Sequence, residues 1–340
     1  MTSADSRRSR MLWLGGAVLA IAVPLAVAGN RFAAFIVGIV FVHILWTAGM
    51  NLLYGYTGLV SMMTAGIAGI GAYVTTNLVM SHGWSFWLAM PVSAVGAAAV
   101  GVILGLPALR LRGFYFVLSS LVIQSAVTLV FVYFPQFTNG DTGITQIPHP
   151  RLWLPGEGAV ELKGAAFEIL LGLLAFAGVG IVHLIVRSRM GAFIMAIRED
   201  DLLAEELGID VTRYKVLVFF IGSLLMGMGG AFYASYVGFI SPRSFDVLVS
   251  LNIWLMVAFG GRGTILGPII GCIILVPIPF VLQDLYMLKD IFYGLLIIVV
   301  TVAMPAGVYG TFLQRRRARE QAAVAALETS RRAAERIAAQ

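Results

Sequence analysis

Charge is what this sequence lacks most. Of its 340 residues, only 23 are Lys or Arg and 17 are Asp or Glu, so 12% of the chain is charged and 59% is apolar. Soluble domains carry about 25% charged and about 45–50% apolar residues. The composition therefore excludes a water-soluble enzyme. It also excludes disorder, which needs low hydrophobicity and high charge.

Cysteine and the common catalytic motifs are equally scarce. The single cysteine, Cys272, excludes internal disulfides and thiolate zinc clusters. The sequence has no Gly-x-x-x-x-Gly-Lys-Ser/Thr loop and no His-Glu-x-x-His motif, so we predict no cofactor and no nucleotide hydrolysis by that mechanism. Asp, Glu, Lys and Arg are absent from the middle of every predicted span, which disfavours an ion-driven carrier. A membrane-embedded enzyme would need convergent polar residues in the bilayer, and the sequence presents none.

Long apolar runs dominate the chain instead. Because they do not alternate in polarity, barrel strands are disfavoured, and we predict an all-α integral membrane protein with about ten transmembrane helices. The stretches 58–80, rich in Gly, Ser and Thr, and 247–260, which is short, are candidates for tilted, broken or re-entrant segments. The first run follows a basic head and is interpreted as a retained span, with a cleaved signal peptide as the alternative. The ten runs are 11–29, 32–54, 58–80, 86–107, 114–134, 166–186, 214–240, 247–260, 264–283 and 288–304.

The basic residues indicate the orientation. If the N-terminus is cytoplasmic and all ten runs cross, 18 of the 23 fall inside, which the positive-inside rule favours. This distribution explains the net charge of +6 without a nucleic-acid partner. The predicted organisation is a cytoplasmic N-terminus (1–10), a transmembrane domain (11–312) with an outside loop (135–165) and a large inside loop (187–213), and a cytoplasmic tail (313–340). The five basic residues outside are Arg31, Arg151, Lys163, Arg243 and Lys289.

The inside loop carries the most informative pattern. Apolar residues from Phe193 to Leu207 fall mostly at helical spacing, and Gly208 is a suitable C-terminal cap, so we expect one short amphipathic helix parallel to the membrane. Two interpretations stay open. The helix is a solvated interfacial element with ordinary charge pairs, such as Arg198 with Asp201, or it docks a cytosolic partner through a leucine centre and an acidic rim. Six of the 17 acids lie here: Glu199, Asp200, Asp201, Glu205, Glu206 and Asp210.

Small residues dominate a second region, around 51–73. Glycines recur there together with Ser61 and Thr64. One interpretation is close packing of helices through small residues. The other is a broken helix whose N-terminal N–H groups face the carboxylate of a passing zwitterion.

Several of these segments resemble one family. The run AIREDDLLAEELGIDVTRYK is similar to the coupling loop of LivM-type permease subunits in the branched-chain amino-acid ABC importer family. Similar stretches lie at 51–73, 109–121, 138–148 and 259–275, so the resemblance extends from about 30 to 312. The matching residues of the loop are Ala196, Arg198, Glu199, Asp200, Ala204, Gly208 and Ile209.

The resemblance implies a permease that moves branched-chain amino acids or a related small solute across the inner membrane of a bacterium. It implies a second homologous permease subunit, two cytosolic ATPase subunits, and a periplasmic or extracellular solute-binding protein. The family commonly has Gly-His-Ala after the serine at 61, where this chain has Met62-Met63-Thr64. Urea, amides and aromatic acids therefore remain alternative cargoes, and a secondary carrier is the less favoured alternative. The expected ATPase-coupling residues are Ala196, Arg198, Glu199, Asp200, Glu205, Gly208 and Ile209. The expected substrate-path residues are Asn51, Gly58, Ser61, Thr64 and Gly66.

Overall fold

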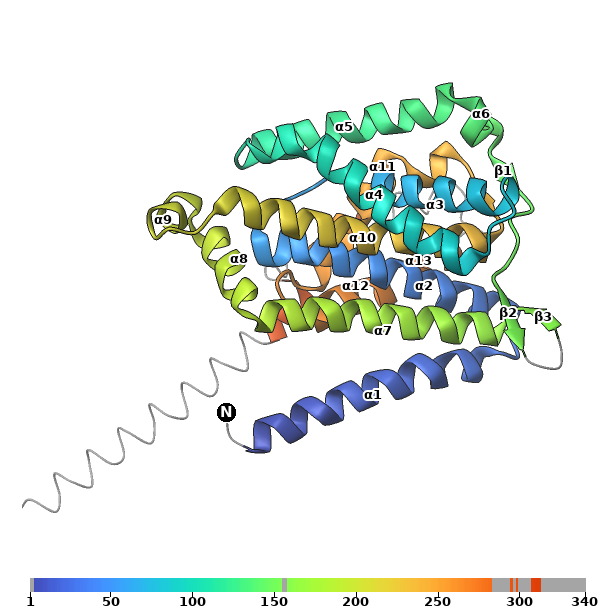
Figure 1. Cartoon of the computed structure of the whole chain (residues 1–340). Helices are drawn as coiled ribbons and strands as arrows, with labels where there is room; N and C mark the ends of the chain where they lie inside the picture. Colours follow the sequence, from blue (N-terminus) through green and yellow to red (C-terminus); the bar gives the residue numbers. More distant parts are fainter. Residues whose placement is uncertain (1–2, 155–157, 283–293, 296–297, 299–306, 313–340) are drawn as a thin grey trace, which may run out of the picture.

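The protein is a bundle of long apolar helices (Figure 1). The computed structural model describes residues 3–154, 158–282, 294–295, 298 and 307–312. Within them, six helical segments are long and apolar enough to cross a membrane, which agrees with the predicted all-α membrane fold. These six are 31–56, 86–109, 114–133, 165–187, 211–237 and 242–260, and shorter apolar helices cover 15–27, 64–80 and 266–281.

The first half of the chain supplies five main helices. Asn30 begins the second of them, because its side chain accepts hydrogen bonds from the N–H groups of Phe32 and Ala33. That helix ends in one π-helical segment, Asn51–Tyr56, and residues 57–63 are not helical apart from the first. The helices are α1 (Ser3–Val27), α2 (Arg31–Met50), α3 (Thr64–Met80), α4 (Phe86–Leu109) and α5 (Phe114–Tyr133).

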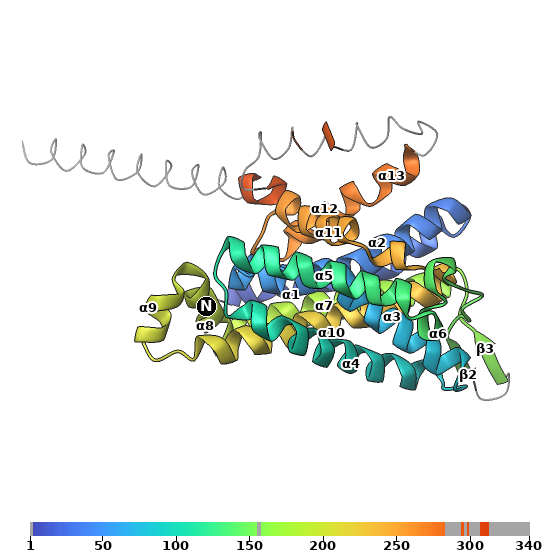
Figure 2. The same cartoon turned by 90° about the horizontal axis from the view of Figure 1, so that it is seen from above.

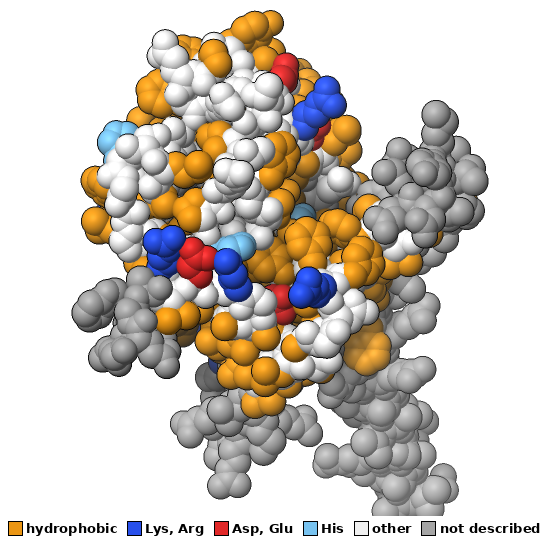
Figure 3. All heavy atoms as spheres, turned by 90° about the vertical axis from the view of Figure 1, so that its right-hand side faces the viewer, with side chains coloured by type: hydrophobic (Ala, Val, Ile, Leu, Met, Phe, Trp, Pro, Cys, Tyr) orange, Lys and Arg blue, Asp and Glu red, His pale blue; other side chains and the backbone are white. Residues whose placement is uncertain are grey.

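A connection at one end of the bundle holds the short strands (Figure 1). It contains α6 (Pro135–Thr138), a 3₁₀ turn (Gly140–Thr142) and β1 (Ile144–Thr145). The strands β2 (Arg151–Leu154) and β3 (Gly158–Glu161) then form an antiparallel hairpin in which Arg151 lies opposite Glu161. Figure 3 shows that few charged side chains lie among the apolar and neutral ones on this face.

The second half begins with α7 (Ala165–Arg187) and continues through α8 (Arg189–Glu199), α9 (Asp201–Glu206) and α10 (Val211–Val237). The strand β4 (Phe239–Ile240) pairs antiparallel with β1. A 3₁₀ turn (Pro242–Phe245), α11 (Val247–Gly260), α12 (Leu266–Leu275) and α13 (Pro277–Val281) follow. The helices α8 and α9 lie at the end of the bundle opposite the β2–β3 hairpin, on the side where α1 begins (Figures 1 and 2).

Glycine allows the central helices to pack closely. A Cβ atom at Gly71 of α3 would overlap the carbonyl of Gly227 in α10, and one at Gly230 would overlap the carbonyl of Ala68. The indole N–H of Trp46 also donates to the carbonyl of Met226, over 3.1 Å. The helix-packing interpretation is therefore confirmed for Gly71, and α2, α3 and α10 form a tightly packed centre.

The predicted spans agree with the structure in position but not all in form. The stretch 58–80 is broken, as proposed, because its helix begins only at Thr64. The stretch 247–260 continues from the preceding 3₁₀ turn into a segment of 19 residues, which is long enough to span. The stretch 264–283 is divided into α12 and α13, the second of which begins at Pro277. The tenth stretch, 288–304, lies mostly outside the described residues and the tail 313–340 entirely so; the count of ten is not confirmed.

Candidate functional site

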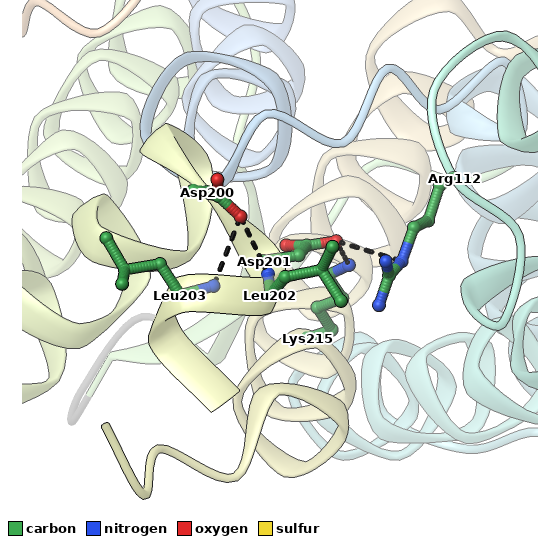
Figure 4. A network of polar contacts seen from close by, with 6 residues as sticks. All are labelled: Arg112, Asp200, Asp201, Leu202, Leu203 and Lys215. Atoms are coloured by element: carbon green, nitrogen blue, oxygen red, sulfur yellow. Dashed lines mark hydrogen bonds and ion pairs between the residues drawn. The ribbon is translucent and has the colours of Figure 1, made fainter. Parts of the chain in front are cut away.

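The inside loop forms two helices instead of the single one expected. The side chain of Asp200 accepts hydrogen bonds from the N–H groups of Leu202 (2.8 Å) and Leu203 (3.2 Å), and its backbone is extended. This is N-cap geometry, so Asp200 ends α8 and starts α9 (Figure 4). The periodic pattern predicts a helix here, but the side chain of an aspartate within it can cap a new helix and so divide the segment in two.

The end of α9 agrees with the sequence prediction. Gly208 has a φ of +83°, which favours glycine, and the N–H of Ile209 donates to the carbonyl of Ala204 over 3.0 Å. The N–H of Gly208 donates to the carbonyl of Glu205 over 2.9 Å. These two bonds form a Schellman motif, so Gly208 and Ile209 close the helix.

The two helices present different faces. Ile194 and Ile197 of α8 are buried against the bundle. Three leucines of the α9 segment are exposed instead, and the carboxylate side chains of Glu199 and Glu205 are exposed nearby. An apolar centre with an acidic rim is thus present on the surface, as the docking interpretation requires. The leucines are Leu202 (57% exposed), Leu203 (56%) and Leu207 (72%).

Arg198 does not form the ion pair with Asp201 that the interfacial interpretation offered as an example. Its Nη1 instead donates to the carbonyl oxygen of Gly55, in the π-helical segment, over 2.7 Å. The side chain passes between two glycines: a Cβ at Gly58 would lie 3.4 Å from its Cγ, and one at Gly263 would lie 2.9 Å from its Nη1. Arg198 therefore connects α8 directly to the point where α2 ends.

Asp201 is shared by two other cations. The Nζ of Lys215, in α10, donates to its Oδ2 over 2.5 Å, and the Nε of Arg112, between α4 and α5, lies 3.9 Å from the same oxygen. The Lys215 side chain is buried, whereas that of Arg112 is 55% exposed. Figure 4 shows both cations converging on this carboxylate.

A cavity of about 330 Å³ lies among these groups. Its wall combines the break at 57–59, the segment between α4 and α5, and the junction of α8 and α9. It is lined by Thr57, Gly58, Leu59, Leu111, Arg112, Gly113, Phe116, Ile197, Arg198, Glu199, Asp200, Asp201, Leu202 and Lys215.

The break between α2 and α3 is tied to the turn between α11 and α12. The Nδ2 of Asn51 donates to the carbonyl of Thr264 over 2.8 Å, and its Oδ1 accepts from the N–H of Gly263 over 3.0 Å. Asn51 is 2% exposed. Asn51 was expected along a substrate path, and in this conformation it holds the π-helical segment and the α11–α12 turn together.

The N-terminus of α3 is capped by side chains from other helices. The N–H of Ala65 donates to Ser250 Oγ over 2.9 Å, and the N–H of Gly66 donates to Gln124 Oε1 over 2.7 Å. The N–H of Met62, in the break, donates to Ser120 Oγ over 3.0 Å. Donors that a helix leaves unpaired at its start are therefore satisfied within the protein. Ser61 and Thr64 are buried beside them.

The sequence analysis did not identify these capping side chains. Ser120 and Gln124 belong to α5 and Ser250 belongs to α11, and all three are fully buried. Gln124 also donates through Nε2 to the carbonyl of Phe245 over 2.8 Å. A glutamine inside an apolar run was the available signal, because a polar side chain in a span is costly unless it is hydrogen-bonded.

The hairpin at the opposite end carries a small charge cluster. Glu161 Oε1 accepts from Arg151 Nη2 over 2.9 Å, and its Oε2 lies 2.7 Å from Lys163 Nζ. The hydrogen bonds from Lys163 and Arg151 lower the pKa of the Glu161 carboxyl. The carboxylate therefore stays charged at neutral pH and links the two strands.

This sequence is similar to known proteins over most of its length. Residues 32–301 match the family described as "Branched-chain amino acid transport system / permease component". The high-affinity branched-chain amino acid transport system permease protein LivM of Escherichia coli (strain K12) is 28% identical over 309 residues, 85% of this chain and 72% of the relative. The LivH permease protein of the same system and strain is 25% identical over 278 residues, 77% of this chain and 89% of the relative. No solved structure matches the chain.

Proposed function

This chain belongs to the family of branched-chain amino acid transport system permease components, and we propose that its own cargo is a branched-chain amino acid. It is a multi-pass membrane permease subunit of an ATP-binding-cassette importer, not an enzyme. ATPase and solute-binding partners are general to such importers. The names of the relatives LivM and LivH give their cargo, and the match covers most of each chain.

The proposed assembly contains this chain, a second homologous permease, two cytosolic ATPase subunits and an extracytoplasmic solute-binding protein. The chain lies in the inner membrane of a bacterium with both termini in the cytoplasm. The distribution of Lys and Arg supports this orientation. The loop 187–213 and the hairpin loop lie at opposite ends of the bundle (Figure 1), as the orientation requires.

The ATPases dock on α8 and α9. Glu199 and Glu205 form the acidic rim, and the exposed leucines of α9 fill the centre of the contact. Ala196 lies on the same helix as Arg198, and Asp200, Gly208 and Ile209 give the docking element its shape through the caps of α9. A partner bound there shifts the equilibrium between two conformations of the permease.

The observation that carries this proposal is the bond from Arg198 to Gly55. It makes a direct path from the docking helices to the break between α2 and α3. A movement of α8 therefore also displaces Gly58 and, through residues 57–63, the start of α3. Asn51 carries the movement to the α11–α12 turn.

The substrate path passes the start of α3. Ser61, Thr64 and Gly66 surround N–H groups that suit a carboxylate, because the positive end of the helix dipole lies there. Ser250 and Gln124 hold these N–H groups between transport events and release them to the cargo. The missing bulk at Gly66 allows Gln124 to approach, since a Cβ there would lie 2.7 Å from its Oε1.

Reconstitution tests this function. The complete complex in proteoliposomes should take up labelled leucine, isoleucine or valine when ATP is present on the cytoplasmic side, and should not when the ATPases carry an inactive phosphate-binding loop. Uptake under an ion gradient without ATPases would instead assign a secondary carrier.

Competition identifies the cargo in the same vesicles. Unlabelled leucine should suppress leucine uptake, while urea, acetamide and benzoate should not. ATP-driven uptake of one of those three, without uptake of branched-chain amino acids, would keep the importer and overturn the cargo.

A further inference from the structure

The segment between α4 and α5 faces the docking helices across the cavity. Arg112 lies two residues before Phe114, the first residue of α5, and the cavity separates this turn from the junction of α8 and α9. The cavity wall includes Gly113, whose φ is +56°, and Phe116 of the first turn of α5. The space therefore lies where α5 can approach or leave the docking helices.

Asp201 has two cationic neighbours, and only one of them is in direct contact with its carboxylate. Lys215 is buried and in direct contact with Oδ2, whereas Arg112 is half-exposed and 3.9 Å from it. Charge-assisted hydrogen bonds are usually about 2.7–2.9 Å long. The contact with Arg112 is thus incomplete in this conformation, and the cavity leaves room for it to shorten.

The helix that follows Arg112 holds the start of α3. Ser120 and Gln124 are one turn apart on α5, and they accept hydrogen bonds from Met62 and Gly66. Among the most apolar residues of α5, 22% are buried within this chain, against 61% for those of α10, so α5 lies at the periphery of the bundle. A displacement of its first turn therefore acts on a peripheral helix whose residues Ser120 and Gln124 make the polar contacts to the start of α3.

We propose that Arg112 is a positioning residue, through which Asp201 of the docking helices moves α5 and so sets the hydrogen bonds that Ser120 and Gln124 make to the start of α3. This inference rests on the proposed function. Movement of α8 and α9 shortens the Asp201–Arg112 contact, closes the cavity and draws in α5. Arg198 acts on the other side of the same cavity, so the two arginines transmit one movement to both neighbours of the break.

The test uses the complete complex in proteoliposomes. Arg112→Gln should reduce ATP-driven leucine uptake two- to five-fold, about the effect that an exposed ion pair has on an equilibrium, while the ATPases still co-purify. Arg112→Lys, which keeps the charge, should restore most of the uptake. Arg110→Gln is the matched control, because Arg110 lies in the same turn and makes no ion pair with any residue that the structure describes.

A distance measurement separates positioning from a merely structural role. Spin labels at Val122→Cys of α5 and Leu184→Cys of α7, both exposed, report the position of α5, while Cys272 is buried. Adding nucleotide should change the label distance in the otherwise unmodified complex and in Arg110→Gln, but not in Arg112→Gln.

Two results would overturn the proposal. One is a nucleotide-dependent distance in Arg112→Gln equal to that of the unmodified protein. The other is an equal loss of uptake in Arg110→Gln and Arg112→Gln, which would assign the effect to general surface charge. Failure of the unmodified complex to transport anything with ATP would contradict the proposed function instead, so the two failures are distinguishable.

Discussion

Gly66 offers a sharp test of the contacts at the start of α3. In Gly66→Ala, the new Cβ would lie 2.7 Å from Gln124 Oε1 and 3.2 Å from Val127 Cγ1. The amide of Gln124 is the end of a flexible side chain and can swing away, but the Gly66 N–H then loses its acceptor. A buried donor without a partner costs about 1–3 kcal/mol.

The higher helix propensity of alanine offsets part of this loss of stability. Alanine is better than glycine inside a helix by about 0.5–1 kcal/mol, so a net loss of about 1–2 kcal/mol is expected. That corresponds to about a five- to thirty-fold change in an equilibrium. We expect ATP-driven uptake to fall by up to this factor, because the lost contact belongs to the segment that moves, and the thermal midpoint of the complex to drop.

Gly96→Ala of α4 is the matched control. No atom lies within 4 Å of the Cβ position at Gly96, so only the gain in helix propensity applies, and uptake should not change. Initial rates of uptake and the thermal midpoint are measured for both variants in the same complex. Identical behaviour of Gly66→Ala and Gly96→Ala would refute the close contact with Gln124 and the role derived from it.

Three further predictions concern the two ends of the bundle. Glu199→Lys together with Glu205→Lys should lower ATP-driven uptake about tenfold while the permease still inserts, because rim charges guide association. Co-purification measures how much ATPase the variant retains. Unchanged ATP-driven uptake would contradict the docking role of these two residues. Arg198→Met should also reduce uptake about tenfold, from loss of a charged hydrogen bond of about 1.5 kcal/mol; full uptake would refute the link to the break. Because the pKa of Glu161 is lowered in the folded state, its stabilisation of the hairpin is present above its unfolded pKa and disappears as pH falls through the folded pKa. The protection of the β2 amides from hydrogen exchange, measured relative to the intrinsic rate at each pH, should therefore fall only at acid pH, and Glu161→Gln should abolish that dependence.

The sequence was sufficient for the positions of the long helices and for one of the caps. Apolar runs located the helices, because burial in a membrane requires about 20 apolar residues whatever their partners. Gly208 was recognised because a positive φ at a helix end is a local requirement. The broken form of 58–80 was also predicted, since the cluster of small and hydroxyl residues lowers helix stability locally.

Partners distant in the sequence were not predictable in this way. Spacing along the helix offers Asp201, three residues away, as one partner for Arg198, but Arg198 donates to Gly55, which is 143 residues away. The two helices of the inside loop were expected as one, since periodicity does not distinguish an internal aspartate from an N-cap. Gln124 and Gly66 are 58 residues apart, and only the packing of α5 against α3 brings them together.

Photo-crosslinking from α9 shows whether the ATPases contact the α8–α9 segment, which is connected to the break between α2 and α3. A photoreactive residue is placed at Glu205 in the intact complex, and another at Glu161 in the hairpin serves as the control. We expect a crosslink to an ATPase subunit from position 205, with a yield that changes on nucleotide binding, and none to an ATPase from position 161. Crosslinks to an ATPase from 161, or none from 205, would contradict it.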